Sequence, residues 1–183
     1  AFIIGEPGAG RHATIAAFAE HIREGQVHPA LEHKRIIELQ FSAVTGTGKT
    51  KGETETLLIK LFNEAVRAGN IILLISDLPA FVSSLAALGI GAGTLLAPCV
   101  EHSGLHILAV ADTVRFRKTI ESDAELVKYF ERIELTEPDP PRLLAILEDH
   151  TLVLEAAYRN RITISYSALI KSVDGAVNHL TTG

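Results

Sequence analysis

The sequence has 183 residues, of which 47% are hydrophobic and 21% are charged, enough for one full core and a smaller appendage. Its formal net charge of −5, without any block rich in lysine and arginine, argues against nucleic acid as a partner. No apolar run approaches the roughly 20 residues that span a bilayer, and the single cysteine, Cys99, cannot form an internal disulfide. We therefore expect a globular, cytoplasmic protein with no membrane partner.

The first 22 residues have the pattern of a strand, a glycine-rich loop and a helix. Gly5 and Gly10 stand at the spacing of a phosphate-binding loop, but Arg11 replaces its lysine and His12 replaces its serine or threonine. Glycines and a helix N-terminus present backbone N–H groups to an anion. The predicted nucleotide-binding residues are Gly5, Glu6, Pro7, Gly8, Ala9, Gly10, Arg11 and His12.

Strands and helices alternate along the next hundred residues. The predicted strands are residues 35–41, 71–75, 105–111 and 132–135, and the predicted helices are residues 53–68, parts of 85–99, and 122–130. This alternation predicts an α/β fold with a mainly parallel sheet, whose ligands bind beyond the carboxyl ends of the strands.

A proline cluster marks a boundary after this region. Pro138, Pro140 and Pro141 separate the sheet pattern from two helical patterns at residues 142–158 and 167–180. We expect a large α/β subdomain at residues 1–137 and a helical piece at residues 138–183. Methionine is absent even at position 1, so we also expect a fragment of a longer protein.

Several segments together resemble the first nucleotide-binding module of the Clp-type AAA+ unfoldases and disaggregases. They are the loop at residues 2–22, the strand at 69–78, the pore-loop segment at 48–55, the sensor strand entry at 105–106 and the segment at 123–130. The resemblance implies a P-loop NTPase-type parallel sheet with helices on both faces, followed by the beginning of a helical lid. It also implies ATP or ADP as cofactor, a homo-hexameric ring, a protein client, and a substrate-contacting loop at Lys49, Thr50, Lys51 and Gly52.

This sequence departs from that family at the residues that the family uses to hydrolyse ATP. The resemblance places Asp77 and Asp112 at catalytic positions, yet one of the usual paired acids is absent and Ser76 stands beside Asp77. Hydrolysing relatives need a lysine, a magnesium-binding hydroxyl and an arginine finger, whereas residues 127–130 contain no arginine. Weak nucleotide binding, a poor magnesium site and little hydrolysis are therefore expected. When the partner acid is absent, a Ser-Asp pair such as Ser76-Asp77 is more often a strand end that caps the next loop than a catalytic pair.

Two alternatives to this nucleotide-binding or nucleotide-silent ring scaffold stay open. Residues 43–50 also fit a relaxed phosphate loop with intact Lys49 and Thr50, which would make the chain an active ATPase. We favour the first loop because the second would leave the glycines at residues 5–10 unexplained. The other alternative is an adaptor that keeps the fold for protein contacts alone. A zinc pair at His102 and His106 is not expected, because a turn separates these residues.

Overall fold

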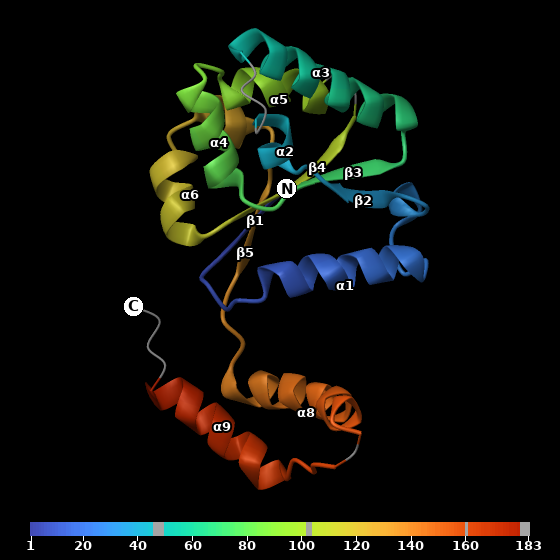
Figure 1. Cartoon of the computed structure of the whole chain (residues 1–183), viewed down its shortest axis with the longest axis vertical. Helices are drawn as coiled ribbons and strands as arrows, with labels where there is room; N and C mark the ends of the chain where they lie inside the picture. Colours follow the sequence, from blue (N-terminus) through green and yellow to red (C-terminus); the bar gives the residue numbers. More distant parts are fainter. Residues whose placement is uncertain (46–49, 102–103, 160, 180–183) are drawn as a thin grey trace. The chain divides into compact units, whose positions relative to one another are not determined.

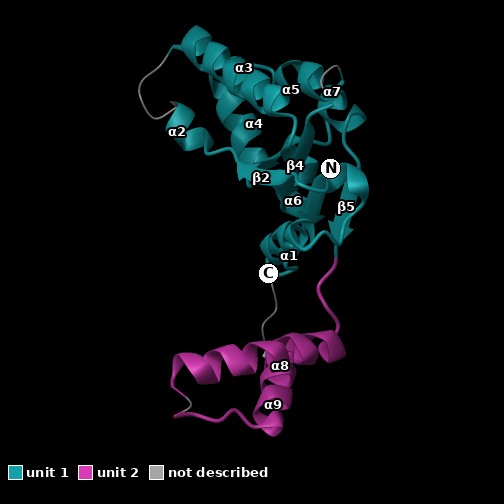
Figure 2. Cartoon of the chain, turned by 90° about the vertical axis from the view of Figure 1, so that its right-hand side faces the viewer, with its two compact units in different colours: residues 1–135 teal, residues 136–183 magenta. Residues whose placement is uncertain are grey.

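The computed structural model describes residues 1–45, 50–101, 104–159 and 161–179. The chain divides into two compact units, Ala1–Leu135 and Thr136–Gly183, which Figure 2 colours separately. Among the described residues, no helix combines the length and the apolar character needed to cross a bilayer.

Unit 1 is built on a parallel sheet whose described strands follow the order β2-β3-β4-β1-β5. The strands are β1 (Phe2–Gly5), β2 (Arg35–Glu38), β3 (Ile71–Ile75), β4 (His106–Ala111) and β5 (Arg132–Leu135). Strands β1 and β3 are almost wholly apolar, as expected where both faces of a strand are buried. The parallel pairing and the alternation of strands with helices confirm the predicted α/β fold class.

Helices cover both faces of the sheet, but unequally (Figure 1). Helix α1 (Arg11–Arg23) lies on one face, where Ile15 packs with Ile3, Leu74 and Val110. The opposite face carries the larger core, with Phe2, Leu58 and Phe81 at its centre. The other helices of unit 1 are the short 3-10 helix η1 (Pro29–Leu31), α2 (Phe41–Thr45), α3 (Lys51–Ala68), α4 (Leu78–Ala87), α5 (Ala92–Glu101), α6 (Thr113–Thr119) and α7 (Ala124–Lys128).

Strand β2 is shorter than the sequence predicted. It ends at Glu38, and Phe41 begins helix α2, so the prediction of a strand through residue 41 was wrong. The ring of Phe41 meets the ring of Phe81 edge-on, with centroids 4.9 Å apart and planes at 77°. Burying this aromatic ring against α4 outweighs the strand-like alternation that led to the longer prediction.

Side-chain caps determine where several helices begin. The apolar pattern of the sequence had placed these helix starts wrongly or had not predicted them. Helix α3 begins at Lys51 rather than Glu53, because Thr50 and Glu53 form a capping box. Helices α4 and α6 were not predicted. The apolar stretch at residues 85–99 is split at Gly89, whose φ of 71° lies in the left-handed region.

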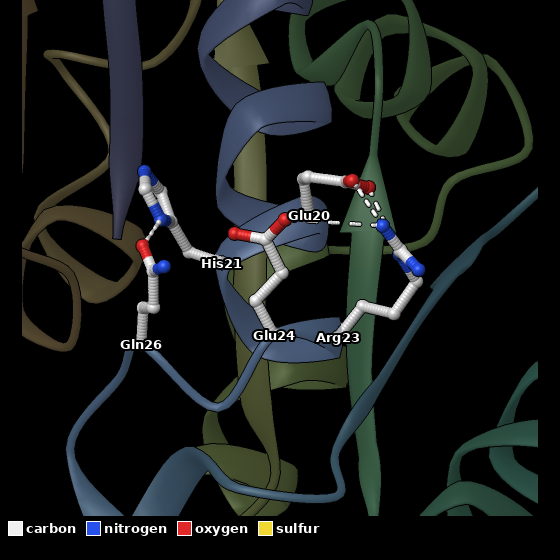
Figure 3. A network of polar contacts seen from close by, with 5 residues as sticks. All are labelled: Glu20, His21, Arg23, Glu24 and Gln26. Carbon is white, nitrogen blue, oxygen red and sulfur yellow. Dashed lines mark hydrogen bonds and ion pairs between the residues drawn. The ribbon is translucent and has the colours of Figure 1, made fainter.

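Figure 3 shows the polar contacts at the C-terminal end of α1, including those of His21. Arg23 forms an ion pair with Glu20 and lies 3.9 Å from a carboxylate oxygen of Glu24. His21 Nδ1 lies 3.0 Å from Gln26 Oε1. These side chains are exposed, so solvent screens the ion pairs and they contribute little to stability.

Unit 2 is a pair of packed helices, α8 (Pro140–Ala157) and α9 (Tyr166–His179), and both predicted helices are therefore present. Helix α8 has Asp139 as its N-cap and proline at its first position, a combination typical of helix starts. Leu169 and Val173 of α9 are buried, whereas Leu152 and Val153 of α8 are 73% and 69% exposed.

Candidate functional site

The turn between β1 and α1 has a backbone that requires glycine. Gly8 and Gly10 have φ values of 95° and 81°, which side-chain-bearing residues rarely adopt. A Cβ on Gly5 would lie 2.9 Å from the carbonyl oxygen of Leu135, because the end of β1 pairs closely with β5. Gly10 is the N-cap of α1 and supplies no side-chain hydrogen bond. The first N–H groups of α1 therefore receive no side-chain cap.

The predicted nucleotide-binding residues thus form one continuous strand-to-helix turn. Between its glycines, the N–H of Ala9 donates to the carbonyl oxygen of Glu6 at 3.1 Å. Arg11 is partly buried at the first position of α1, and its positive charge contributes to lowering the pKa of Asp77. His12 is exposed at the second position. The loop lies beside the carboxyl end of β1, where a parallel sheet binds its ligands.

The two predicted catalytic acids follow neighbouring strands and begin the next helices. Asp77 follows β3 and is the N-cap of α4, where its Oδ1 accepts the N–H of Ala80 at 3.0 Å. Asp112 follows β4 and is the N-cap of α6, where its Oδ1 accepts the N–H of Arg115 at 2.7 Å. Each acid therefore caps a helix, which is the second of the two roles considered for Asp77.

One guanidinium group joins these two acids. Arg115 Nη1 donates to Asp77 Oδ2 at 3.0 Å, and Arg115 Nε lies 3.7 Å from Asp112 Oδ2. Partial burial acts to raise the pKa of Asp77, but the Ala80 N–H and the charges of Arg115 and Arg11 outweigh it, so this pKa lies below its ordinary value.

Arg115 was missed by the sequence analysis. The available signal was its position three residues after Asp112, since a capping aspartate that starts a helix lies beside the third residue of that helix. The apolar pattern of the sequence did not predict α6. The three-residue spacing of Asp112 and Arg115 therefore could not be interpreted before the structure showed this helix.

The predicted pore-loop residues lie at the start of α3, apart from Lys49, which falls outside the described residues. The Thr50 hydroxyl accepts the N–H of Glu53 at 3.4 Å, and Glu53 Oε2 accepts from both the N–H and the hydroxyl of Thr50. Lys51 Nζ donates to the carbonyl oxygen of Gly89 at 2.5 Å. Gly52 is exposed. Thr50 and Lys51 thus anchor α3 in this structure.

The segment that the family resemblance linked to an arginine finger is mostly occupied by internal contacts. Phe130 is buried and stacks on Phe2, with ring centroids 4.5 Å apart. The hydroxyl of Tyr129 lies 3.2 Å from a carboxylate oxygen of Glu101, and Lys128 Nζ lies 5.0 Å from the Tyr129 ring centroid. Lys128 is the exposed cation of this segment.

Cys99 lies in α5 rather than beside the glycine loop. Its Sγ is 3.7 Å from the carbonyl oxygen of Leu95, and burial raises the pKa of the thiol. A raised pKa favours the thiol form of Cys99 over the more reactive thiolate. His106 is exposed at the start of β4, whereas His102, with which a zinc pair was not expected, lies outside the described residues.

The parallel sheet, the glycine turn after β1 and the acids after two neighbouring strands define an α/β domain of the phosphate-loop NTPase type. Comparisons with known proteins give its family. The chain is 33% identical over 180 residues to the chaperone protein ClpB of Wolinella succinogenes and 34% identical over 172 residues to the ClpC ATP-binding subunit of Staphylococcus aureus strain USA300. These alignments cover 98% and 93% of the chain but 21% of each relative, so the chain spans about a fifth of their length.

Solved structures agree with the sequence comparison. A closed-state structure of Hsp104 with ATPγS and FITC-casein superposes with a TM-score of 0.83 at 25% identity, covering 98% of this chain and 30% of that one. An ADP complex of Saccharomyces cerevisiae Hsp104 gives a TM-score of 0.80 at 25% identity over 97% of this chain and 30% of that one. No family model matches the chain. The chain is an AAA+ domain of the Clp-type unfoldase and disaggregase family.

Magnesium, which ATP-hydrolysing enzymes of this fold use, does not fit the donor groups present. An imidazole at His12 replaces the hydroxyl, and magnesium prefers oxygen ligands. The carboxylates of Asp77 and Asp112 already face the guanidinium of Arg115. Among the described residues, no group of three or more histidine, cysteine, aspartate or glutamate side chains could hold a metal ion.

Proposed function

We propose that this domain is a ring module of a Clp-type protein-remodelling machine that binds nucleotide weakly and hydrolyses it at no more than background. One observation carries the proposal: the turn between β1 and α1 keeps the glycine backbone of a phosphate loop, while Arg11 and His12 occupy the positions of lysine and hydroxyl. The relatives named above include an Hsp104 bound to ADP and another bound to ATPγS and casein.

The nucleotide would be held chiefly by backbone. Gly8 and Gly10 leave space beside the loop, since, apart from their chain neighbours, no atom of the described part of the chain lies within 4 Å of a Cβ built on either. The first N–H groups of α1 and the positive end of the helix dipole favour a phosphate group. Arg11 would add a positive charge, although its forked guanidinium is bulkier than an ammonium group and matches two phosphate oxygens rather than one point.

Hydrolysis of ATP requires more than a loop that binds phosphate. Phosphoryl transfer relies on a metal held by hydroxyl and carboxylate, a positioned water and a finger arginine, the last commonly giving about 10³ to 10⁵ in rate. Here His12 replaces the hydroxyl, Arg115 engages Asp77, and Lys128 stands in the segment expected to carry the finger. We infer that Asp77 and Asp112 occupy former catalytic positions and now serve as helix caps.

The assembly that we propose follows the family. The domain would form part of a homo-hexameric ring, with residues 1–137 as the large subdomain and residues 138–183 as the beginning of its helical lid. Residues 49–52 would be the pore loop, in which Thr50 offers no aromatic ring to grip a protein client. A module of this kind would contribute ring contacts while an active module elsewhere supplies the hydrolysis.

The alternative phosphate loop at residues 43–50 is disfavoured by one contact. Both the N–H and the hydroxyl of Thr50 are hydrogen-bonded to Glu53 Oε2, so the hydroxyl is already engaged in the capping box of α3. An active ATPase that uses Lys49 would have to break this capping box before the Thr50 hydroxyl could bind magnesium. A pure adaptor role is distinguished from our proposal only by the absence of nucleotide binding.

Fluorescent ATP titrated with and without magnesium tests the proposal. We expect weak binding that does not depend on magnesium and that is reduced by Arg11→Ala. The matched control is Arg23→Ala, which removes an exposed arginine from the far end of the same helix and should leave binding unchanged. Binding that requires magnesium would support the active enzyme, and no binding at all would support the adaptor.

A further inference from the structure

The acid pair, Asp77 and Asp112, is brought together by the sheet itself. Strands β3 and β4 pair in parallel, with Ile75 opposite Ala109, so both strands direct the following residues to the same edge. Two carboxylates at this edge are the type of oxygen donor that a divalent cation prefers. Here each carboxylate instead faces Arg115, through contacts of 3.0 Å and 3.7 Å.

We propose that Arg115 is a built-in cation that excludes divalent metal ions from the acid pair. The guanidinium occupies the space between the two carboxylates with a permanent positive charge, so a metal ion would have to displace it and then remain beside it. The exclusion concerns the free protein and does not depend on nucleotide. Its functional consequence, nucleotide binding without magnesium, rests on the proposed function.

The hydrogen bonds of Asp77 and Asp112 favour binding of Arg115, which belongs to the same domain, over binding of a metal ion from solution. One oxygen of each aspartate accepts a backbone N–H at the start of its helix, and the remaining oxygens, Asp77 Oδ2 and Asp112 Oδ2, face Arg115. Arg115 is carried by the helix that Asp112 itself begins, so the guanidinium is held near both acids at high effective concentration. Arg11 adds a second positive charge near Asp77.

A purely structural role for Arg115 would predict a different outcome. The same contacts also join the start of α6 to the start of α4, and exposed ion pairs of this kind contribute little to stability. If Arg115 only joined the two helices, its removal would slightly lower stability and would not alter metal binding. The side chains of Arg115 and Asp77 are each 49% exposed, so a hydrated ion has access to the pair.

Manganese(II) alone is the probe, because its electron paramagnetic resonance signal reports the free ion directly. We expect wild type to bind Mn²⁺ negligibly at this pair, and Arg115→Gln to bind it at least about tenfold more tightly, since a repelling charge at contact distance is removed. Arg115→Gln combined with Asp77→Asn should lose the gain. Asparagine keeps the N-cap in that double variant, so the loss would report on charge.

Two controls separate exclusion from general charge effects. Arg115→Lys keeps a positive charge and should behave as wild type, and Arg117→Gln removes an exposed arginine from the same helix and should also behave as wild type. The inference is overturned if folded Arg115→Gln gains no Mn²⁺ affinity, or if wild type binds Mn²⁺ at a site that Asp77→Asn abolishes. Wild-type binding of Mn²⁺ at this pair would overturn the inference even if the glutamine variant fails to fold. No nucleotide is present, so failure of the proposed function would not affect the result.

Discussion

Adding one methyl group at Gly5 tests whether the candidate site is built as described. In Gly5→Ala, the new Cβ would lie 2.9 Å from the Leu135 carbonyl oxygen, 3.1 Å from Ala9 Cβ and 3.2 Å from Leu135 Cβ. Such overpacking commonly costs about 1–3 kcal/mol, while the loss of glycine flexibility in the unfolded chain returns about 0.4–1 kcal/mol. We expect a net destabilisation of about 1–2 kcal/mol, or a fall in melting temperature of about 3–6 °C.

Urea unfolding followed by far-ultraviolet circular dichroism measures this change, and Gly52→Ala is its control. Apart from its chain neighbours and the backbone of its own helix, no atom of the described residues lies within 4 Å of a Cβ built on Gly52, which is in the first turn of α3, so alanine there should stabilise by about 0.5–1 kcal/mol. If Gly5→Ala were as stable as wild type, the β1–α1 turn would not sit against β5, and the reasoning about the loop would fail.

Two further predictions concern charge and nucleotide. Because the folded-state pKa of Asp77 is lowered, the charge of Asp77 stabilises the fold above about pH 4, and this contribution is lost as the pH falls through the folded pKa. Asp77→Asn should therefore be less stable than wild type at pH 7, by no more than about 1 kcal/mol for so exposed a pair, and this difference should shrink as the pH falls below about 4; a difference in urea midpoints that does not change with pH would contradict this. Arg11→Lys combined with His12→Thr should tighten ATP binding in the presence of magnesium, and Lys49→Ala should leave it unchanged; the opposite pattern in a labelled-ATP titration would assign the site to residues 43–50.

The sheet was predictable from the sequence because its strands are short apolar runs between polar turns. Ile71–Ile75 is an uninterrupted aliphatic run that ends in Ser76 and Asp77, and no competing pattern fits it. The glycine loop was equally visible, since Gly5 and Gly10 flank a turn between a strand pattern and a helix pattern. Fold class and the position of the loop therefore followed from local sequence and the family resemblance.

The contacts within the site were not predictable in the same way. Helix α6 is only seven residues long, Thr113–Thr119, and it is set by the cap at Asp112 rather than by an apolar stripe. The meeting of Arg115 with Asp77 joins residues 38 positions apart and depends on the order of β3 and β4 in the sheet. The sequence suggested that Asp77 is either a catalytic acid or a cap, and only the tertiary structure shows that Arg115 is its ion-pair partner.

Phosphate release at saturating ATP and magnesium tests the central claim most directly. The domain retains a glycine loop but carries Arg11, His12 and an arginine-bound Asp77 where hydrolysis requires other groups. We predict steady-state release indistinguishable from a buffer without protein. Turnover of about 1 per second, an ordinary rate for this chemistry, would contradict the account.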